Sequence, residues 1–216
     1  YLIKDEAREV PAELSGKFTY QIDSSVDLPC VGDWVTANFY NNDTAAIIHQ
    51  MFPRKTFLRR KTPGANVDFQ MIAANIDTAF IVQSCHFDFN PSRLDRYLVM
   101  ATDGHVEPIV ILTKTDLITQ DELDQKLAII SSVTKARVIA LSNITGIGFA
   151  ELQQTLSSGK TYCLLGSSGV GKTTLINRLI GQEAFETKAV SSTGEGTHTT
   201  TRRQLIVLSQ GAMLID

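Results

Sequence analysis

The sequence is poor in cysteine and has no excess of positive charge. Its 216 residues include three cysteines, Cys30, Cys85 and Cys163, which lie far apart without C-x-x-C spacing. This excludes a disulfide framework, and Cys85 with His86 and Asp88 offers too few donors for a good metal site. Lys and Arg number 20 against 23 Asp and Glu, a net charge of −3, so any contact with nucleic acid must be local. The reduced cysteines agree with a cytoplasmic protein.

Long apolar runs are also absent. No stretch approaches the ~20 residues that span a membrane, and we expect neither a signal peptide nor a membrane partner. Hydrophobic residues make up 43% and charged residues 20%, which excludes a disordered or collagen-like chain. The sequence begins at Tyr1 rather than Met and ends at Asp216, directly after an apolar run. We therefore expect a piece of a longer protein.

The first third of the sequence is typical of short β-strands. Residues 17–22, 33–39 and 45–50 alternate apolar and polar side chains or are rich in β-forming residues, with turn residues between them. Several short strands in this length predict a small barrel or sandwich. The run Thr-Pro-Gly-Ala-Asn at residues 62–66 then breaks the pattern. We expect one domain at residues 1–66 and a second at residues 67–216.

Beyond residue 71, apolar runs alternate with amphipathic stretches. The expected strands are residues 78–84, 108–113, 137–142, 161–165, 203–208 and 212–215. The expected helices, the first of them capped by Ser92, are residues 94–101, 122–132, 149–156 and 172–180. This alternation predicts an α/β fold with a parallel sheet covered on both faces. The polar residues 190–203 predict a loop.

A phosphate-binding motif lies between an expected strand and helix. Residues 166–173 read Gly-Ser-Ser-Gly-Val-Gly-Lys-Thr and match G-x-x-x-x-G-K-[ST]. The glycines let backbone N–H groups surround a phosphate, and the helix N-terminus faces the same anion. Lys172 is predicted to reach the β- and γ-phosphates in catalysis, and Thr173 to bind Mg²⁺. The predicted nucleotide-binding residues here are Gly166, Ser167, Ser168, Gly169, Val170, Gly171, Lys172, Thr173 and Thr174.

Two other strand ends favour guanine over adenine. The segment Thr113, Lys114, Thr115 and Asp116 resembles the guanine-specifying Asn-Lys-x-Asp element, with one Thr hydroxyl where that element has an amide. The Asp116 carboxylate can accept from guanine N1–H and the exocyclic amine together, a donor pair that adenine lacks. Ser142 and Asn143 begin a segment similar to the one whose backbone N–H groups contact guanine O6. Each segment alone could be a solvated turn, but with the phosphate loop they favour GTP over ATP.

The order of these motifs is unusual. The guanine element at 113–116 precedes the phosphate loop at 166–173, whereas in most GTPases it follows. The same sheet forms if the original ends are joined and the chain is cut elsewhere. Switch I is then residues 191–203, with Thr199, Thr200 or Thr201 closing on Mg²⁺, and we choose Thr200 for catalysis and metal binding. Asp216 opens the Asp-x-x-Gly switch II motif and holds Mg²⁺, usually through water.

These residues resemble the RsgA (YjeQ/EngC) family of circularly permuted GTPases, which act in small ribosomal subunit maturation. The resemblance includes the phosphate loop, residues 29–35, 53–56 with 59–61, and 196–201. It implies an OB-fold domain at residues 1–66, a permuted GTPase domain at 67–216, and a C-terminal zinc-binding domain beyond this sequence. The partners that it implies are GTP and GDP, the small (30S) subunit and its 16S rRNA. We expect a monomer whose slow GTP hydrolysis is stimulated by the subunit.

One short segment concentrates positive charge. Its basic side chains are Arg54, Lys55, Arg59, Arg60 and Lys61. They suit contact with RNA phosphates, and the alternative is a solvated strand edge. Trp34 is either a stacking residue or part of the core. Two other functions remain open: an ATP-using phosphoryl-transfer enzyme on the same loop, and an RNA-binding module with a regulatory nucleotide site.

Overall fold

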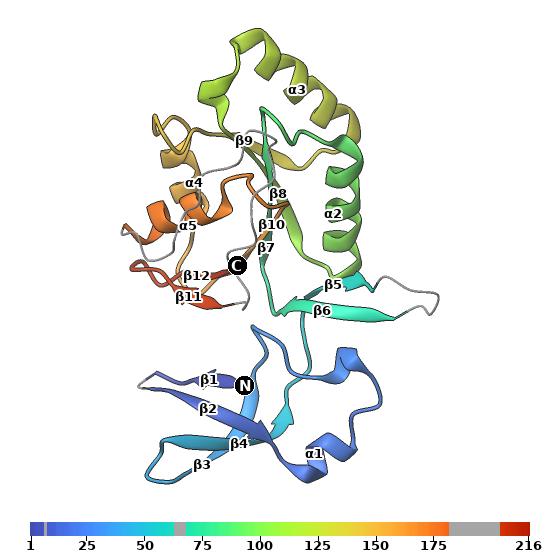
Figure 1. Cartoon of the computed structure of the whole chain (residues 1–216), viewed down its shortest axis with the longest axis vertical. Coiled ribbons are helices and arrows are strands. Elements are labelled where there is room, and N and C mark those ends of the chain that lie inside the picture. Colours follow the sequence, from blue (N-terminus) through green and yellow to red (C-terminus); the bar gives the residue numbers. More distant parts are fainter. Residues whose placement is uncertain (7, 63–67, 182–203) are drawn as a thin grey trace. The chain divides into compact units, whose positions relative to one another are not determined.

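The computed structural model describes residues 1–6, 8–62, 68–181 and 204–216. The chain divides into two compact units, Tyr1–Asn75 and Ile76–Asp216 (Figure 1). Within the described ranges, no helix is both long and apolar enough to cross a membrane.

The first unit is built from short strands. Its four-stranded sheet contains, in spatial order, β1 (Leu2–Lys4), β2 (Glu9–Leu14), β4 (Ala45–Met51) and β3 (Val35–Tyr40). Strand β2 runs parallel to β4, and the other neighbours are antiparallel. Strands β5 (Phe57–Lys61) and β6 (Phe69–Ala74) form an antiparallel hairpin. The hairpin shares no strand pairing with the sheet among the described residues.

One detail of the first unit differs from the expectation. Residues 17–22 were expected as a strand, and this prediction is wrong: helix α1 spans Gly16–Tyr20, and the Ser15 hydroxyl caps it by accepting from Phe18 N. The boundary expected between residues 66 and 67 lies outside the described residues; on either side of it, Thr62 N donates to Asp68 O at 2.9 Å. The first compact unit extends to Asn75.

The second unit contains the α/β sheet that the alternation predicts. Its six strands are, in spatial order, β11 (Leu205–Val207), β12 (Met213–Ile215), β10 (Thr161–Leu165), β7 (Thr78–Ser84), β8 (Glu107–Thr113) and β9 (Arg137–Ala140). All neighbours are parallel except β11, which runs antiparallel to β12. The edge pair is antiparallel because a tight turn joins it, with Leu208 N donating to Ala212 O at 2.8 Å.

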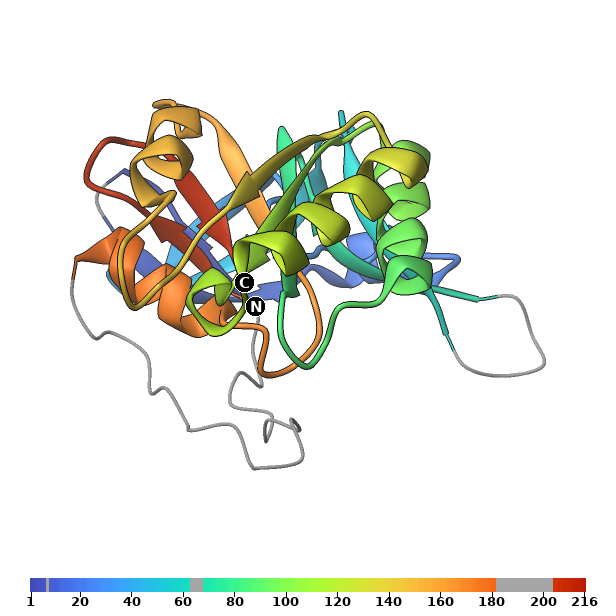
Figure 2. The ribbon, with the colours of Figure 1, turned by 90° about the horizontal axis from the view of Figure 1, so that it is seen from above.

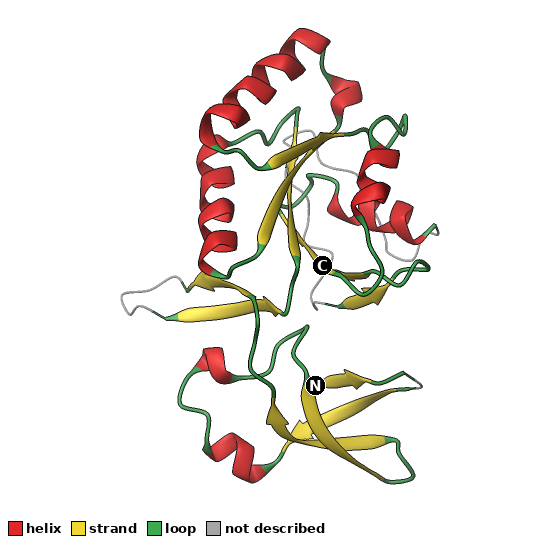
Figure 3. Cartoon of the chain, turned by 180° about the vertical axis from the view of Figure 1, so that it is seen from behind, coloured by secondary structure: helices red, strands yellow, loops and turns green. Residues whose placement is uncertain are grey.

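Helices cover both faces of this sheet. They are α2 (Pro91–Asp103), α3 (Gln120–Val133), α4 (Phe149–Thr155) and α5 (Lys172–Ile180). Phe80 and Val82 of β7 pack in a core with α4 and α5, whereas Ile81 between them packs in a core with α2 and α3. Figures 2 and 3 show the two helical layers on opposite sides of the strands. The prediction of a sheet covered on both faces is therefore confirmed.

Capping residues set where the helices of the second unit begin. Asn90, not the expected Ser92, caps α2, because its side chain accepts from Arg93 N and Pro91 follows it. Helix α3 begins with a capping box in which the Thr119 hydroxyl accepts from Glu122 N and the Glu122 carboxylate accepts from Thr119 N. This carboxylate bond to the Thr119 N–H is the main reason that the pKa of Glu122 lies below its ordinary value.

The capping box predicts a measurable loss of stability. Thr119→Ala removes the side-chain acceptor at the N-terminus of α3 and should lower the free energy of unfolding by about 1 kcal/mol. Denaturant unfolding followed by circular dichroism measures this change. Ser131→Ala, which removes an exposed hydroxyl that bonds back to Leu127 O on the same helix, is the control and should change stability by less than about 0.5 kcal/mol. Equal effects of the two substitutions would argue against the cap.

Candidate nucleotide-binding site

The predicted phosphate loop joins β10 to α5 at the carboxyl edge of the sheet. Helix α5 begins at Lys172, and its N-cap, Gly171, has φ 99° and ψ 17° and offers no side-chain cap. The first N–H groups of the helix therefore remain available to an anion. Gly166 packs so closely on β7 that an added Cβ would lie 2.5 Å from Val82 O. The loop thus has the strand, turn and helix context that its motif requires.

Lys172 is turned onto its own loop. Its Nζ donates to Gly166 O at 2.9 Å and to Ser167 O at 2.8 Å. Burial lowers the pKa of this ammonium, while the nearby carboxylates of Asp216 and Asp88 act in the opposite direction. A phosphate would give the half-buried cation an anionic partner at the same place.

The guanine element contacts the phosphate loop directly. The buried Thr113 hydroxyl donates to Val170 O at 2.6 Å, with Gln83 O at 3.2 Å. Lys114, in the left-handed region at φ 61° and ψ 37°, donates from Nζ to Gly169 O at 2.8 Å. One hydroxyl therefore suffices, where the related element has an amide, to attach the end of β8 to the loop.

Asp116 is held by the other guanine-type segment. The Ser142 hydroxyl donates to Asp116 Oδ1 at 2.5 Å and accepts from Ile144 N and Thr145 N, each at 3.1 Å. Asn143 Nδ2 lies 3.4 Å from Gly171 O, and its Oδ1 is buried without a hydrogen-bond partner among the described residues. The two strand ends and the loop therefore form one connected group of residues, with an unsatisfied acceptor beside the loop.

The remaining predicted site residues fall into two groups. Thr115 begins a short 3-10 helix (Thr115–Leu117), Ser168 lies in the phosphate loop, and Thr173 and Thr174 follow Lys172 in the first turn of α5. Thr200 lies outside the described residues, as does the expected switch I segment at 191–203.

The hydroxyl of Thr173 and the carboxylate of Asp216 fit a magnesium ion. Both supply hard oxygen donors, the type that Mg²⁺ prefers. Asp216 follows β12, and its negative charge acts to raise the pKa of the half-buried Lys172 ammonium. The described residues hold no group of three or more His, Cys, Asp or Glu side chains suited to a metal. Magnesium here would therefore take phosphate oxygens or waters as further ligands.

An ion pair that the sequence reasoning missed lies beside the phosphate loop. Arg93, in the first turn of α2, donates from Nη1 to Asp88 Oδ1 at 2.5 Å and to Ser167 Oγ at 2.7 Å. Ser167 Oγ in turn donates to Asp88 Oδ2. The neighbouring Cys85 is buried, and desolvation raises its pKa to about 11, which suits packing rather than metal binding. In the sequence, only the position of Asp88 shortly after the end of an expected strand suggested a functional role for this pair.

The basic segment of the first unit does not present all of its charges. Arg54 is nearly enclosed: its Nε and Nη2 donate to Asp33 at 2.8 and 2.7 Å, and Nη1 donates to Val26 O. The guanidinium of Arg59 lies over the rings of Phe57 and Phe69. The exposed members of the segment are Lys55, Arg60 and Lys61.

Trp34 is a surface residue. Its side chain is 66% exposed, and that of Phe52 is 49% exposed. Phe52 N donates to Trp34 O at 2.9 Å, so the two aromatic residues are neighbours, Trp34 just before β3 and Phe52 just after β4. The interpretation of Trp34 as a core residue is therefore wrong.

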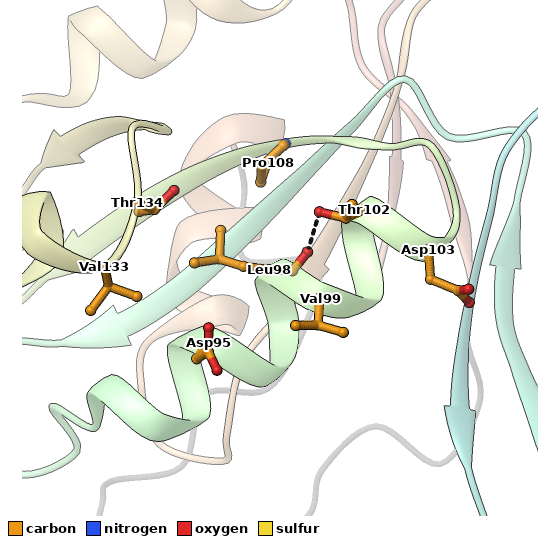
Figure 4. Close-up of a pocket in the computed structure, with 8 residues that line it drawn as sticks. All are labelled: Asp95, Leu98, Val99, Thr102, Asp103, Pro108, Val133 and Thr134. Atoms are coloured by element: carbon orange, nitrogen blue, oxygen red, sulfur yellow. Dashed lines mark hydrogen bonds between the residues drawn. The ribbon is translucent and has the colours of Figure 1, made fainter.

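An open groove of about 490 Å³ lies apart from this site. Leu98 and Val99 of α2 line it together with Val133, Thr134 and Pro108 (Figure 4). Pro108 stands near the start of β8, whereas Thr113, which contacts the phosphate loop, ends that strand. The groove is therefore at the other end of the strand.

The fold and the connected loops define a class of protein. A phosphate loop on a central strand is attached to a guanine-type element that precedes it in the chain, which is the arrangement of a circularly permuted P-loop domain. The RsgA GTPase family model matches residues 51–216. The chain belongs to this family.

Individual relatives agree. The chain is 43% identical to a small ribosomal subunit biogenesis GTPase RsgA 2 from Lactiplantibacillus plantarum, over 100% of this chain and 61% of the relative. It is 37% identical to an RsgA from Opitutus terrae, over 96% of this chain and 59% of the relative. The chain thus spans about three fifths of the length of these relatives.

Solved structures share the fold. YjeQ from Thermotoga maritima matches with a TM-score of 0.70 and 25% identity, over 100% of this chain and 69% of that chain. YloQ, whose structure is described as a circularly permuted GTPase, matches with a TM-score of 0.64 and 24% identity, over 100% and 66%. The permuted order inferred from the motifs is therefore confirmed.

The ion pair beside the loop predicts an effect on nucleotide affinity. Arg93→Gln leaves the Asp88 charge without its partner and loosens Ser167, so GDP should bind about tenfold more weakly, or ~1.4 kcal/mol. Titration with a fluorescent GDP analogue measures this. Arg96→Gln, an exposed arginine one turn along α2, is the control and should leave affinity unchanged. Identical affinities of the Arg93 and Arg96 variants would refute a role in holding the loop.

Proposed function

We propose that this chain is the nucleotide-binding and RNA-contacting part of a GTPase that hydrolyses GTP to GDP and phosphate during small-subunit maturation. The observation that carries the proposal is the position of Asp116, which Ser142 orients while Thr113 and Lys114 attach the same segment to the phosphate loop. A carboxylate held on a segment that is attached to the phosphate loop can pair with the N1–H and amine of guanine. Membership of the RsgA GTPase family supports the same reading.

The chain's own residues account for positioning and charge neutralisation. The loop N–H groups and the N-terminus of α5 hold the phosphates, and Lys172 leaves its backbone partners to pair with the β- and γ-phosphates. Thr173, Asp216 and Thr200 are the proposed magnesium ligands, and Thr200 the proposed switch I residue in catalysis. When bound, the ion neutralises charge on the phosphate oxygens. Phosphoryl transfer needs little else from the protein beyond an oriented water.

The proposed partner is the small ribosomal subunit in the cytoplasm. The relatives' names include small ribosomal subunit biogenesis. We infer that the first unit contacts 16S rRNA through Lys55, Arg60 and Lys61, whose exposed charges can meet phosphates. Arg54 and Arg59 are left out of this surface, because Arg54 pairs with the enclosed Asp33 carboxylate and the guanidinium of Arg59 lies over the Phe69 ring. Trp34 and Phe52 add exposed aromatic area on which an unpaired base can stack.

Two substitutions test the nucleotide site in the full-length protein. Lys172→Ala should lower the rate of GTP hydrolysis by roughly 10²–10³, because the developing phosphate charge loses its cation. Asp116→Ala should reduce the preference for GDP over ADP, measured by competition against a fluorescent nucleotide. Lys160→Ala, which removes an exposed lysine paired with Asp77, is the matched control and should behave as the wild type.

Two results would contradict the proposal. Equal affinities of the wild type for GDP and ADP would favour an ATP-using enzyme. A hydrolysis rate that purified small subunits leave unchanged would favour an RNA-binding module with a regulatory nucleotide site.

The rRNA surface has its own test. Replacing Lys55, Arg60 and Lys61 together with Gln should weaken binding to 16S rRNA and reduce the slope of log affinity against log salt by about 2–3, roughly one for each phosphate contact. Filter binding over a range of salt concentrations measures both. Lys4→Gln with Lys17→Gln, two basic residues elsewhere in the first unit, is the control. An unchanged slope in the triple variant would rule out this surface.

Arg54→Gln should act on stability instead. Asp33, whose side chain is 1% exposed, would be left as a buried charge without its partner. We expect a loss of about 3 kcal/mol in the free energy of unfolding, measured with denaturant. A variant that keeps its stability but loses RNA affinity would show that Arg54 contacts RNA directly.

A further inference from the structure

Arg178 joins the phosphate-loop helix to the guanine-type segment after β9. It lies on α5, the helix that Lys172 begins, and its Nη1 donates to Asn143 O at 2.6 Å, with Ser142 O at 3.4 Å. Its guanidinium also lies over the ring of Phe149, 4.5 Å from the centroid. No motif singled out this arginine, because it lies six residues beyond the Lys172 of the phosphate loop.

The segment from residue 142 to 146 is shaped around this guanidinium. Gly146 has φ +84°, and an added Cβ would lie 2.6 Å from Arg178 Nη2. Gly146 N donates to Ser142 O at 3.0 Å, which closes the turn on the same carbonyl that Arg178 approaches. A side chain at residue 146 would therefore displace the arginine as well as strain the turn.

The contact determines where a backbone N–H points. Ser142 O and the N–H of Asn143 belong to one planar trans peptide, so they point in opposite directions. With Ser142 O directed toward Arg178 and the turn, the N–H of Asn143 is directed away from both. In the guanine-type reading of this segment, that N–H faces O6 of the base.

We propose that Arg178 is a positioning residue for guanine recognition. Through Ser142 O and Asn143 O it holds the two peptides that flank Asn143, and so keeps the Asn143 N–H in the orientation that reads O6. This inference rests on the proposed function. It assigns the base selectivity of the site to two separate supports: Asp116, held by Ser142, for the N1–H side, and the peptides held by Arg178 for O6.

The test uses the full-length protein with Arg178→Gln, Arg178→Lys and Arg137→Gln. GDP, IDP and ADP are the probes, because GDP and IDP carry O6 and ADP does not. In Arg178→Gln we expect GDP and IDP to bind about tenfold more weakly by the same factor, while ADP binding is unchanged. Arg178→Lys keeps a cation near the carbonyls and should recover part of the loss. Arg137→Gln removes an exposed arginine paired with Glu151 and should match the wild type for all probes.

The outcomes distinguish a failure of this inference from a failure of the proposed function. If Arg178→Gln weakens GDP, IDP and ADP equally, or weakens none of them, the arginine does not position the base segment and the proposal fails. A lowered melting temperature of Arg178→Gln with an unchanged ratio of GDP to ADP affinity would also contradict the proposal, because it would show that the arginine contributes only to packing. If the wild type itself binds GDP and ADP equally, the guanine reading of the whole site fails first.

Discussion

The rest of the site depends on the attachment of the end of β8 to the phosphate loop. The Thr113 hydroxyl and the Lys114 ammonium each donate to a loop carbonyl, Val170 O and Gly169 O. Both bonds are at least partly shielded from water, where a hydrogen bond left unmade is costly. They therefore set the loop at a defined place relative to Asp116, two residues beyond Lys114.

Chain order has little influence on this arrangement. The strands that carry the loop and the guanine-type segments are parallel, so their carboxyl ends share one edge whatever the order in which they are made. Strand β10, late in the chain, lies between β7 and β12 near the middle of the sheet. A permuted chain thus forms the same edge, and its side chains meet through hydrogen bonds between segments more than fifty residues apart.

The basic segment shows how strongly tertiary context changes the meaning of a local pattern. Five cations in eight residues look equivalent in the sequence. In the structure Arg54 neutralises the buried Asp33, Arg59 packs on aromatic rings, and Arg60 pairs with Gln70 at the surface. A buried charge needs a partner of opposite charge. Arg54 pairs with the enclosed Asp33 and is therefore not available to a ligand.

Local sequence patterns were enough to predict the elements that carry the site. The bounds of β7, β10 and α5 match the expected ones, because apolar runs, glycines and helical spacing act over a few residues. The order of the motifs also indicated the circular permutation, because that inference needs only the positions of the guanine element and the phosphate loop in the sequence. The exposure of Trp34, the bond of Arg93 to Ser167 and the reach of Arg178 to Asn143 follow from the tertiary structure alone. Such features depend on which distant segments pack together, as in the Arg93–Ser167 bond across 74 residues, and no local pattern encodes that choice.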